Sequence, residues 1–308
     1  MPESYLDIDW PKLSAFITKY DKLFHDGFIT NNIPQNVYWD ITGYGKMAAG
    51  RALTDLIEVL SFNLKFKVEA TDYMARRCRG FIGDCMRRYL TTEQEVIRAL
   101  GTVEAETREF PVIESIEASE YRRLRAGLEQ GRPPAFWNQD DPARFDAAEV
   151  RDYVESMDDH CVREFSPCLH DAVEHLKNQS TNSYGAAKEL GDIWQGEAAQ
   201  LARDRFAVIG KQADQLVPHM QKFVDQYEAL GATIRQIKAG VPDLDRGFLD
   251  WLRGEDTDGR AHEYLAEIQN KFHDHYTRFL ALYQDLEKVD VILPADRGET
   301  GTYLAWAG

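Results

Sequence analysis

Hydrophobic side chains recur every three or four residues along most of this chain. The most regular run lies at positions 209–237, where the spacing alternates between four and three residues. Its members, here called the seam, are Ile209, Ala213, Leu216, Met220, Phe223, Tyr227, Leu230, Ile234 and Ile237. This alternation places one apolar stripe along a helix and is typical of coiled-coil-like packing against a partner helix. Strict apolar–polar alternation, which indicates strands, is almost absent.

The periodicity predicts two helices in the first third of the chain. The first starts near Asp9, whose carboxylate can accept from the free amides of the first turn, and ends before Gly27. The second runs from about Lys46 to beyond Leu90. We therefore expect a helix–loop–helix hairpin over residues 9–100, with a glycine-rich connection.

A second hairpin is predicted downstream, with the seam forming its second helix. Its first helix starts near Val150 and should kink at Pro167, which lacks a backbone N–H. The run NQSTNSYG at 178–185 predicts a break, because Asn, Ser and Thr favour caps and turns. Within the seam helix, Pro218 predicts a bend rather than a stop.

Two further helices are predicted outside the hairpins. A connection rich in proline carries one short helix around Ser119–Leu128, and a last long helix spans about Gly259–Lys288. The fold class is therefore all-α, an elongated antiparallel bundle of two hairpins plus a further long C-terminal helix. The expected units are a first hairpin at 1–107, a connection at 108–146, a second hairpin at 147–240, and the C-terminal helix and tail at 241–308.

Charge and chemistry narrow the class of function. Fifty-two acidic and 36 basic side chains give a formal net charge of −16, which disfavours nucleic acid and anionic lipid as partners. The usual phosphate-binding, zinc-protease and hydrolase motifs are missing. We therefore expect a protein that is not an enzyme, with no cofactor, no metal and no small-molecule substrate.

The distribution of apolar stretches argues against a cleavable secretory signal and against a membrane-inserting segment. The acidic start of the chain has no basic region followed by an apolar run, so no cleavable secretory signal is expected. The nearest candidate for a membrane-inserting segment, residues 53–70, carries several charged side chains, among them Asp55, Glu58, Lys65 and Lys67. A helical membrane-active, pore-forming protein therefore stays open only as a further alternative.

Four cysteines form two pairs with six residues between the members of each pair. The pairs are Cys78 with Cys85 and Cys161 with Cys168. Zinc sites usually place two to four residues between paired ligands, so this spacing does not fit them. Reduced cysteines in a helical core, disulfides between crossing helices, and a metal site completed by His160 and His170 all stay open at this point.

One short stretch interrupts the helical pattern in an unusual way. Trp194-Gln195-Gly196 stands between two amphipathic segments and is followed by Ala198, Ala199 and Phe206. Glycine permits bend conformations that a Cβ resists, and alanines let the outgoing helix lie close to its neighbour. The tryptophan fills the space left by the small residues, and we expect part of it to stay accessible to a partner.

These residues resemble the Trp-x-Gly (WXG, ESAT-6-like) superfamily of type VII secretion substrates. The resemblance covers about residues 9–100 and 150–240, although the first hairpin lacks the tripeptide. It implies a Tyr-x-x-x-acid export signal after a hairpin's second helix. Tyr89 and Glu93 match that pattern best, and Tyr283 with Glu287 is the second choice.

Taken together, the resemblance implies a single-chain version of a secreted heterodimer or an effector-targeting module. Tyr89, Glu93, Trp194 and Gly196 would form a composite signal, read by a secretion ATPase or secretion chaperone. The chain would then be made in the cytoplasm and secreted without a cleavable signal peptide. A cytoplasmic helical-bundle adaptor or chaperone is the alternative, and association into homo- or hetero-oligomers is left open.

Overall fold

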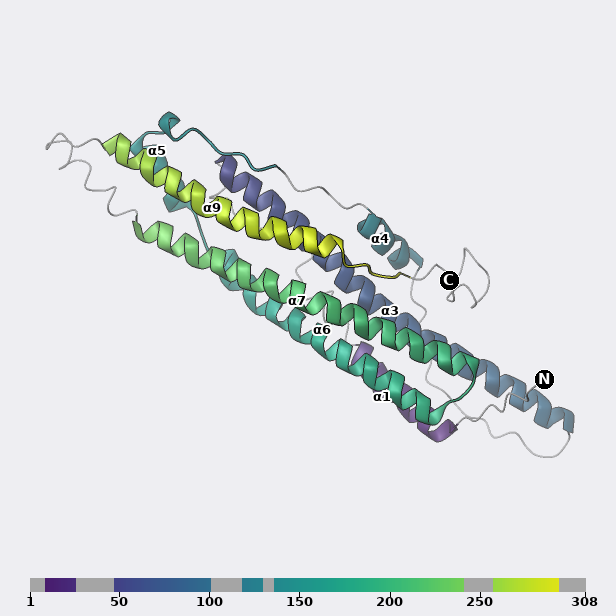
Figure 1. Ribbon diagram of the computed structural model, residues 1–308. Coiled ribbons are helices and arrows are strands. Elements are labelled where there is room, and N and C mark those ends of the chain that lie inside the picture. Colours follow the sequence, from purple (N-terminus) through teal and green to yellow (C-terminus); the bar gives the residue numbers. More distant parts are fainter. Residues whose placement is uncertain (1–8, 26–46, 101–117, 130–135, 241–256, 294–308) are drawn as a thin grey trace.

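The computed structural model describes residues 9–25, 47–100, 118–129, 136–240 and 257–293. Every regular element among these residues is a helix and none is a strand, so the all-α class is confirmed. The long helices run nearly lengthwise and give the described part an elongated shape (Figure 1). In chain order they are α1 (Trp10–His25), α3 (Ala48–Leu100), α4 (Ala118–Glu129), the short 3₁₀ helix η2 (Pro142–Arg144), α5 (Ala147–Ser156), α6 (His160–Ile193), α7 (Glu197–Gly240) and α9 (Thr257–Glu287).

Helix ends agree with several local signals in the sequence. Asp9 caps α1, since its carboxylate accepts from the backbone N–H of Lys12 at 3.2 Å. Asp146 and Glu149 form a reciprocal capping box at the start of α5. The short helix expected in the proline-rich connection is α4.

The first helix of the second hairpin differs from the prediction. It continues unbroken through residues 178–185, with Pro167 inside it, and the chain instead breaks between α5 and α6. Ser180 shows why the predicted break at 178–185 is wrong. Its hydroxyl faces α7 and donates to Asp214 Oδ1 at 2.5 Å, so contact between helices outweighs the local preference for a turn.

The seam behaves as its spacing predicts. Every member is at most 1% exposed, and α7 runs through Pro218 without stopping. Since α6 and α7 make the most extensive helix pair in the described part of the chain, the stripe has a long partner surface.

Buried apolar residues separate into two main clusters along the bundle. The first, here called the far half, draws on residues 47–68 of α3, 162–176 of α6 and 213–237 of α7. It also contains α5 and α9. Helix α9 packs along both α3 and α7 and supplies the large rings Phe272 and Phe279.

The second cluster, here called the bend half, lies where α6 turns into α7. It draws on residues 74–86 of α3, 186–193 of α6 and 199–209 of α7, and α1 completes it by packing on α3 and α6. The described part of α1 therefore lies beside the second half of α3, whereas the first turns of α3 belong to the far half (Figure 1). The connection predicted between these helices, residues 26–46, falls outside the described residues.

Candidate functional site at the bend

The Trp-x-Gly stretch forms the bend between α6 and α7. Trp194 leaves the helix in an extended conformation while its backbone N–H still donates to Leu190 O at 3.0 Å. Gly196 has φ of 110°, and it is the one described residue with a clearly positive φ. Helix α7 starts at the next residue, and Glu197 in its first turn complements the positive end of the helix dipole. The bend expected from the tripeptide is therefore present, with glycine at the strained position.

Trp194 is part of the core rather than of the surface. The side chain is 1% exposed and packs in the bend half, where Phe206 and Ala199 are also buried. Its indole N–H has no hydrogen-bond partner among the described residues. The expectation that this tryptophan stays partly accessible is therefore wrong, because α1 and α3 close over the bend.

The structure brings Tyr89 of α3 to this tryptophan. The two ring centroids are 6.4 Å apart and the rings meet edge to face at 84°. This geometry lets the electropositive edge of one ring meet the electronegative face of the other. Burial raises the pKa of the Tyr89 hydroxyl. The Glu197 carboxylate acts on this pKa in the same direction, as does Cys85 once its thiol is deprotonated at high pH.

Glu93 lies in α3 one helical turn beyond Tyr89. The last turns of α3 extend past the bend (Figure 1). The Glu93 side chain lies outside the described residues. The two members of the predicted signal are thus placed on one helix that projects from the bend end of the bundle.

Helix α1 adds contacts at the bend that the sequence analysis did not foresee. The backbone N–H of Asp9 donates to Ile193 O at 3.0 Å and ties the start of α1 to the end of α6. Further along, Lys19 Nζ lies 2.6 Å from Glu189 Oε2. Opposite charges on two separate predicted helices were the available signal, but nothing local pairs Lys19 with Glu189.

The second-choice signal lies in the far half and is engaged internally. Tyr283 is 5% exposed, and its hydroxyl donates to Glu287 Oε1 at 2.6 Å, one turn further along α9. Burial, together with that hydrogen bond to a carboxylate, raises the pKa of Tyr283 to about 12. The pair therefore serves the packing of α9 against the core.

All four cysteines are free thiols in this structure. Cys78 is buried in the bend half, where its Sγ donates to Ala202 O at 3.8 Å, and burial strongly raises the pKa of the thiol. Cys85, Cys161 and Cys168 are partly exposed. Among the described residues, no group of three or more His, Cys, Asp or Glu side chains could hold a metal ion.

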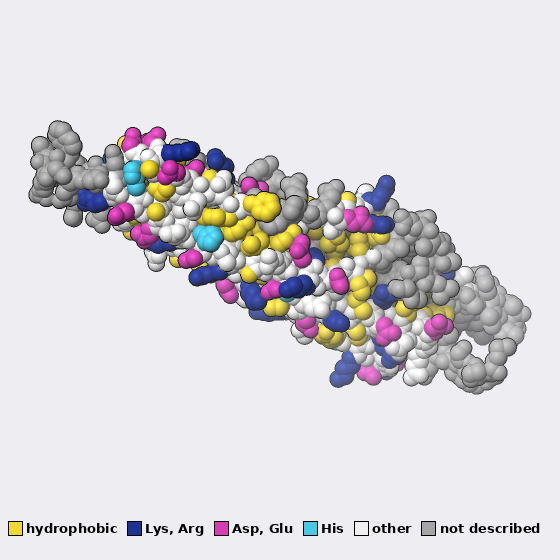
Figure 2. Space-filling model, turned by 45° about the horizontal axis from the view of Figure 1, so that its top comes forward, with side chains coloured by type: hydrophobic (Ala, Val, Ile, Leu, Met, Phe, Trp, Pro, Cys, Tyr) yellow, Lys and Arg dark blue, Asp and Glu magenta, His cyan; other side chains and the backbone are white. Residues whose placement is uncertain are grey.

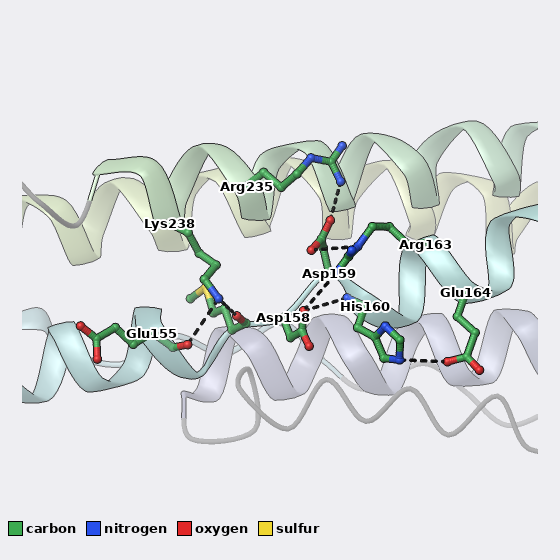
Figure 3. Close-up of polar contacts among 9 residues, drawn as sticks. Glu155, Asp158, Asp159, His160, Arg163, Glu164, Arg235 and Lys238 are labelled. Atoms are coloured by element: carbon green, nitrogen blue, oxygen red, sulfur yellow. Dashed lines mark hydrogen bonds and ion pairs between the residues drawn. The ribbon is translucent and has the colours of Figure 1, made fainter.

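The opposite end of the α6–α7 pair is closed by charged groups (Figure 3). Asp159 is 8% exposed and accepts from Arg235 Nη1 at 2.5 Å, with Arg163 Nε 3.5 Å away. Lys238 Nζ donates to the carbonyl oxygens of Met157 at 2.6 Å and Glu155 at 3.4 Å. Two cations from α7 thereby satisfy the acid between α5 and α6 and the carbonyls at the end of α5.

On the surface of the described residues, we find no second group of side chains as closely arranged as Tyr89 and Trp194. On the face drawn in Figure 2, acidic and basic side chains alternate along the molecule, and hydrophobic side chains gather near its middle. Phe136 is 93% exposed. No helix in the described part of the chain is long and apolar enough to cross a membrane.

Comparisons with protein-family models, with curated proteins and with solved structures found no match for this chain.

Proposed function

We propose that this chain is a type VII secretion substrate or effector-targeting module whose bend end is read by the export machinery. The single polypeptide takes the place of the two subunits of a Trp-x-Gly heterodimer, and it is not an enzyme. The partner is a secretion ATPase or a secretion chaperone. The chain is exported in its folded state, without a cleavable signal peptide.

The contact between Tyr89 and Trp194 carries the proposal. These residues lie far apart in the sequence, and the resemblance assigns each of them to a different half of the export signal. Their rings meet edge to face with centroids 6.4 Å apart at the end of the bundle. The resemblance requires this juxtaposition, and a generic helical turn does not.

Burial assigns different roles to the two halves of the signal. Trp194 is 1% exposed, so a partner protein could not read it directly in this conformation. Tyr89 is only partly buried, and Glu93 follows it on the projecting turns of α3. We assign Tyr89 and Glu93 to partner contact, with Trp194 and Gly196 fixing the position of Tyr89.

An export assay of the full chain in a bacterium with an active type VII system tests this assignment. Tyr89→Ala and Glu93→Ala should abolish appearance in the medium while leaving the helical circular dichroism unchanged. Tyr184→Ala is the matched control, because it removes a 42% exposed tyrosine away from the bend and should be exported normally. Normal export of both signal variants would reject the proposal and favour a cytoplasmic adaptor.

A further inference from the structure

Buried polar side chains gather where the bend half and the far half meet. Along α6, the apolar core of the far half ends at Leu176 and that of the bend half begins at Ala186. Gln179 and Ser183, between these positions, are 4% and 0% exposed. Interiors of helical bundles are normally apolar at such positions, so this interruption needs a physical explanation.

The register of α6 against α7 places a third buried polar residue at this level. Ser166 donates a hydrogen bond to Glu228, Ser180 donates one to Asp214, and the Arg203 side chain occupies the space where a Cβ on Gly191 would lie. Each step along α6 is matched by an equal step backwards along α7, as in any antiparallel pair. Gln212 of α7, which is 3% exposed, therefore lies opposite residues 179–183.

Helix α3 contributes an acid to the same region. Asp72 is 9% exposed, and its Oδ1 lies 3.2 Å from Nε2 of His175, one turn before Gln179 on α6. Along α3, it stands between Val68 of the far half and Met74 of the bend half. We call Asp72, Gln179, Ser183 and Gln212 the central polar layer.

Five polar atoms in this layer lack a hydrogen-bond partner among the described residues. They are Asp72 Oδ2, Gln179 Oε1, Ser183 Oγ, and Gln212 Nε2 and Oε1. A buried polar atom left without a partner costs free energy, and in native proteins such atoms are satisfied by ordered water when no protein group reaches them. Clustered donors and acceptors of this kind are what a buried water requires.

We propose that the central polar layer binds a small set of ordered water molecules and forms a joint between two separately opening halves. The two apolar cores stop on either side of it. Helices α3, α6 and α7 cross it, and α4 packs along α3 at the same level, from Phe66 to Arg76. Each core is completed by a different helix, α1 in the bend half and α9 in the far half. The bend half, with the shorter α1, opens first while the far half stays folded.

Hydrogen exchange read by mass spectrometry on the full chain tests the joint. In the wild-type protein, amides at 200–209 of α7 should exchange at least about tenfold faster than those at 220–237, as expected for separate cooperative units. The double variant Gln179→Leu with Gln212→Leu joins the two apolar cores. It should bring the two rates together and raise the urea midpoint.

Gln215→Leu is the matched control, because it makes the same change at an exposed position of α7 and should leave the rate ratio unchanged. Equal exchange rates in the two wild-type segments would overturn the joint. A lower urea midpoint in the double variant would show that the side-chain amides of Gln179 and Gln212 bond to protein groups, and would overturn their hydration. A high-resolution crystal structure with no water at Gln212 would overturn the hydration of the layer.

Discussion

The bend half and the far half are built on the same three helices but closed in different ways. At the bend, Trp194 and Phe206 are buried in a core that α1 completes, and the chain reverses through one glycine. At the other end, Asp159, Arg235 and Lys238 join α7 to the α5–α6 connection through charge and carbonyl contacts (Figure 3).

This difference bears on the recognition proposed for the bend end. Aromatic packing at the bend fixes the position of one partly buried tyrosine with few polar requirements. The charged end satisfies its groups internally, with Asp159 bound from two helices. At the charged end, the polar groups are already paired within the protein, so fewer of them are available to a partner. At the bend, Tyr89 is fixed in position but only partly buried, so part of its side chain is available.

The largest expected effect comes from removing the ring at the bend. Trp194→Ala should lower the free energy of unfolding by about 3–5 kcal/mol, because it leaves a cavity in a closed core. The loss of amide protection should be confined to the bend half. Phe279→Ala, made at a fully buried ring of the far half, should instead reduce protection there. If each variant reduced protection throughout, the division into two halves would be wrong.

A smaller effect should follow from changing the backbone at the bend. Gly196→Ala forces a Cβ onto a residue with φ of 110° and should cost about 1–2 kcal/mol. Gly80→Ala is the matched control, because neither added Cβ would come within 4 Å of an atom outside its own local backbone and chain neighbours. Gly80 is inside α3, where alanine should add up to about 1 kcal/mol of stability. Urea unfolding should thus give opposite signs for the two changes.

The smallest effect expected is a pH dependence limited to the far half. Burial lowers the pKa of His275, helped by Arg278 and opposed by Asp274, while its Nε2 lies 2.8 Å from Thr233 Oγ1. The unfolded chain then takes up a proton below about pH 6.5 that the folded protein resists, so stability falls as the pH is lowered. We expect a loss of no more than about 1 kcal/mol between pH 7 and pH 5.

Hydrogen exchange at the two pH values, corrected for the intrinsic rates, measures this dependence. Among the buried polar residues of the described part of the chain, His275 on α9 is the one histidine, so the protection of the bend half should change less. His275→Gln keeps a hydrogen-bonding side chain without the titration and should remove the difference. An unchanged pH dependence in that variant would assign the effect to another group.

Local sequence signals predicted the helices well where they depended on spacing alone. The seam, the α1 cap at Asp9 and the bend at Gly196 required only neighbouring residues to be identified. Turn preference failed at 178–185, because burial of Ser180 and Ser183 against α7 decided the conformation. The accessibility of Trp194 was also mispredicted, since it depends on α1 and α3 rather than on the tripeptide.

By itself, the sequence determined the all-α class, the apolar face of most long helices and the residue at which α6 turns into α7. Each of these follows from periodicity or from one residue's backbone preference. The tertiary structure decided which parts of the apolar helix faces share a core. It also placed α1 beside the second half of α3 and Tyr89 against Trp194. Those outcomes depend on the register between helices distant in sequence, which the free energy of the whole packed interior selects and local pattern does not encode.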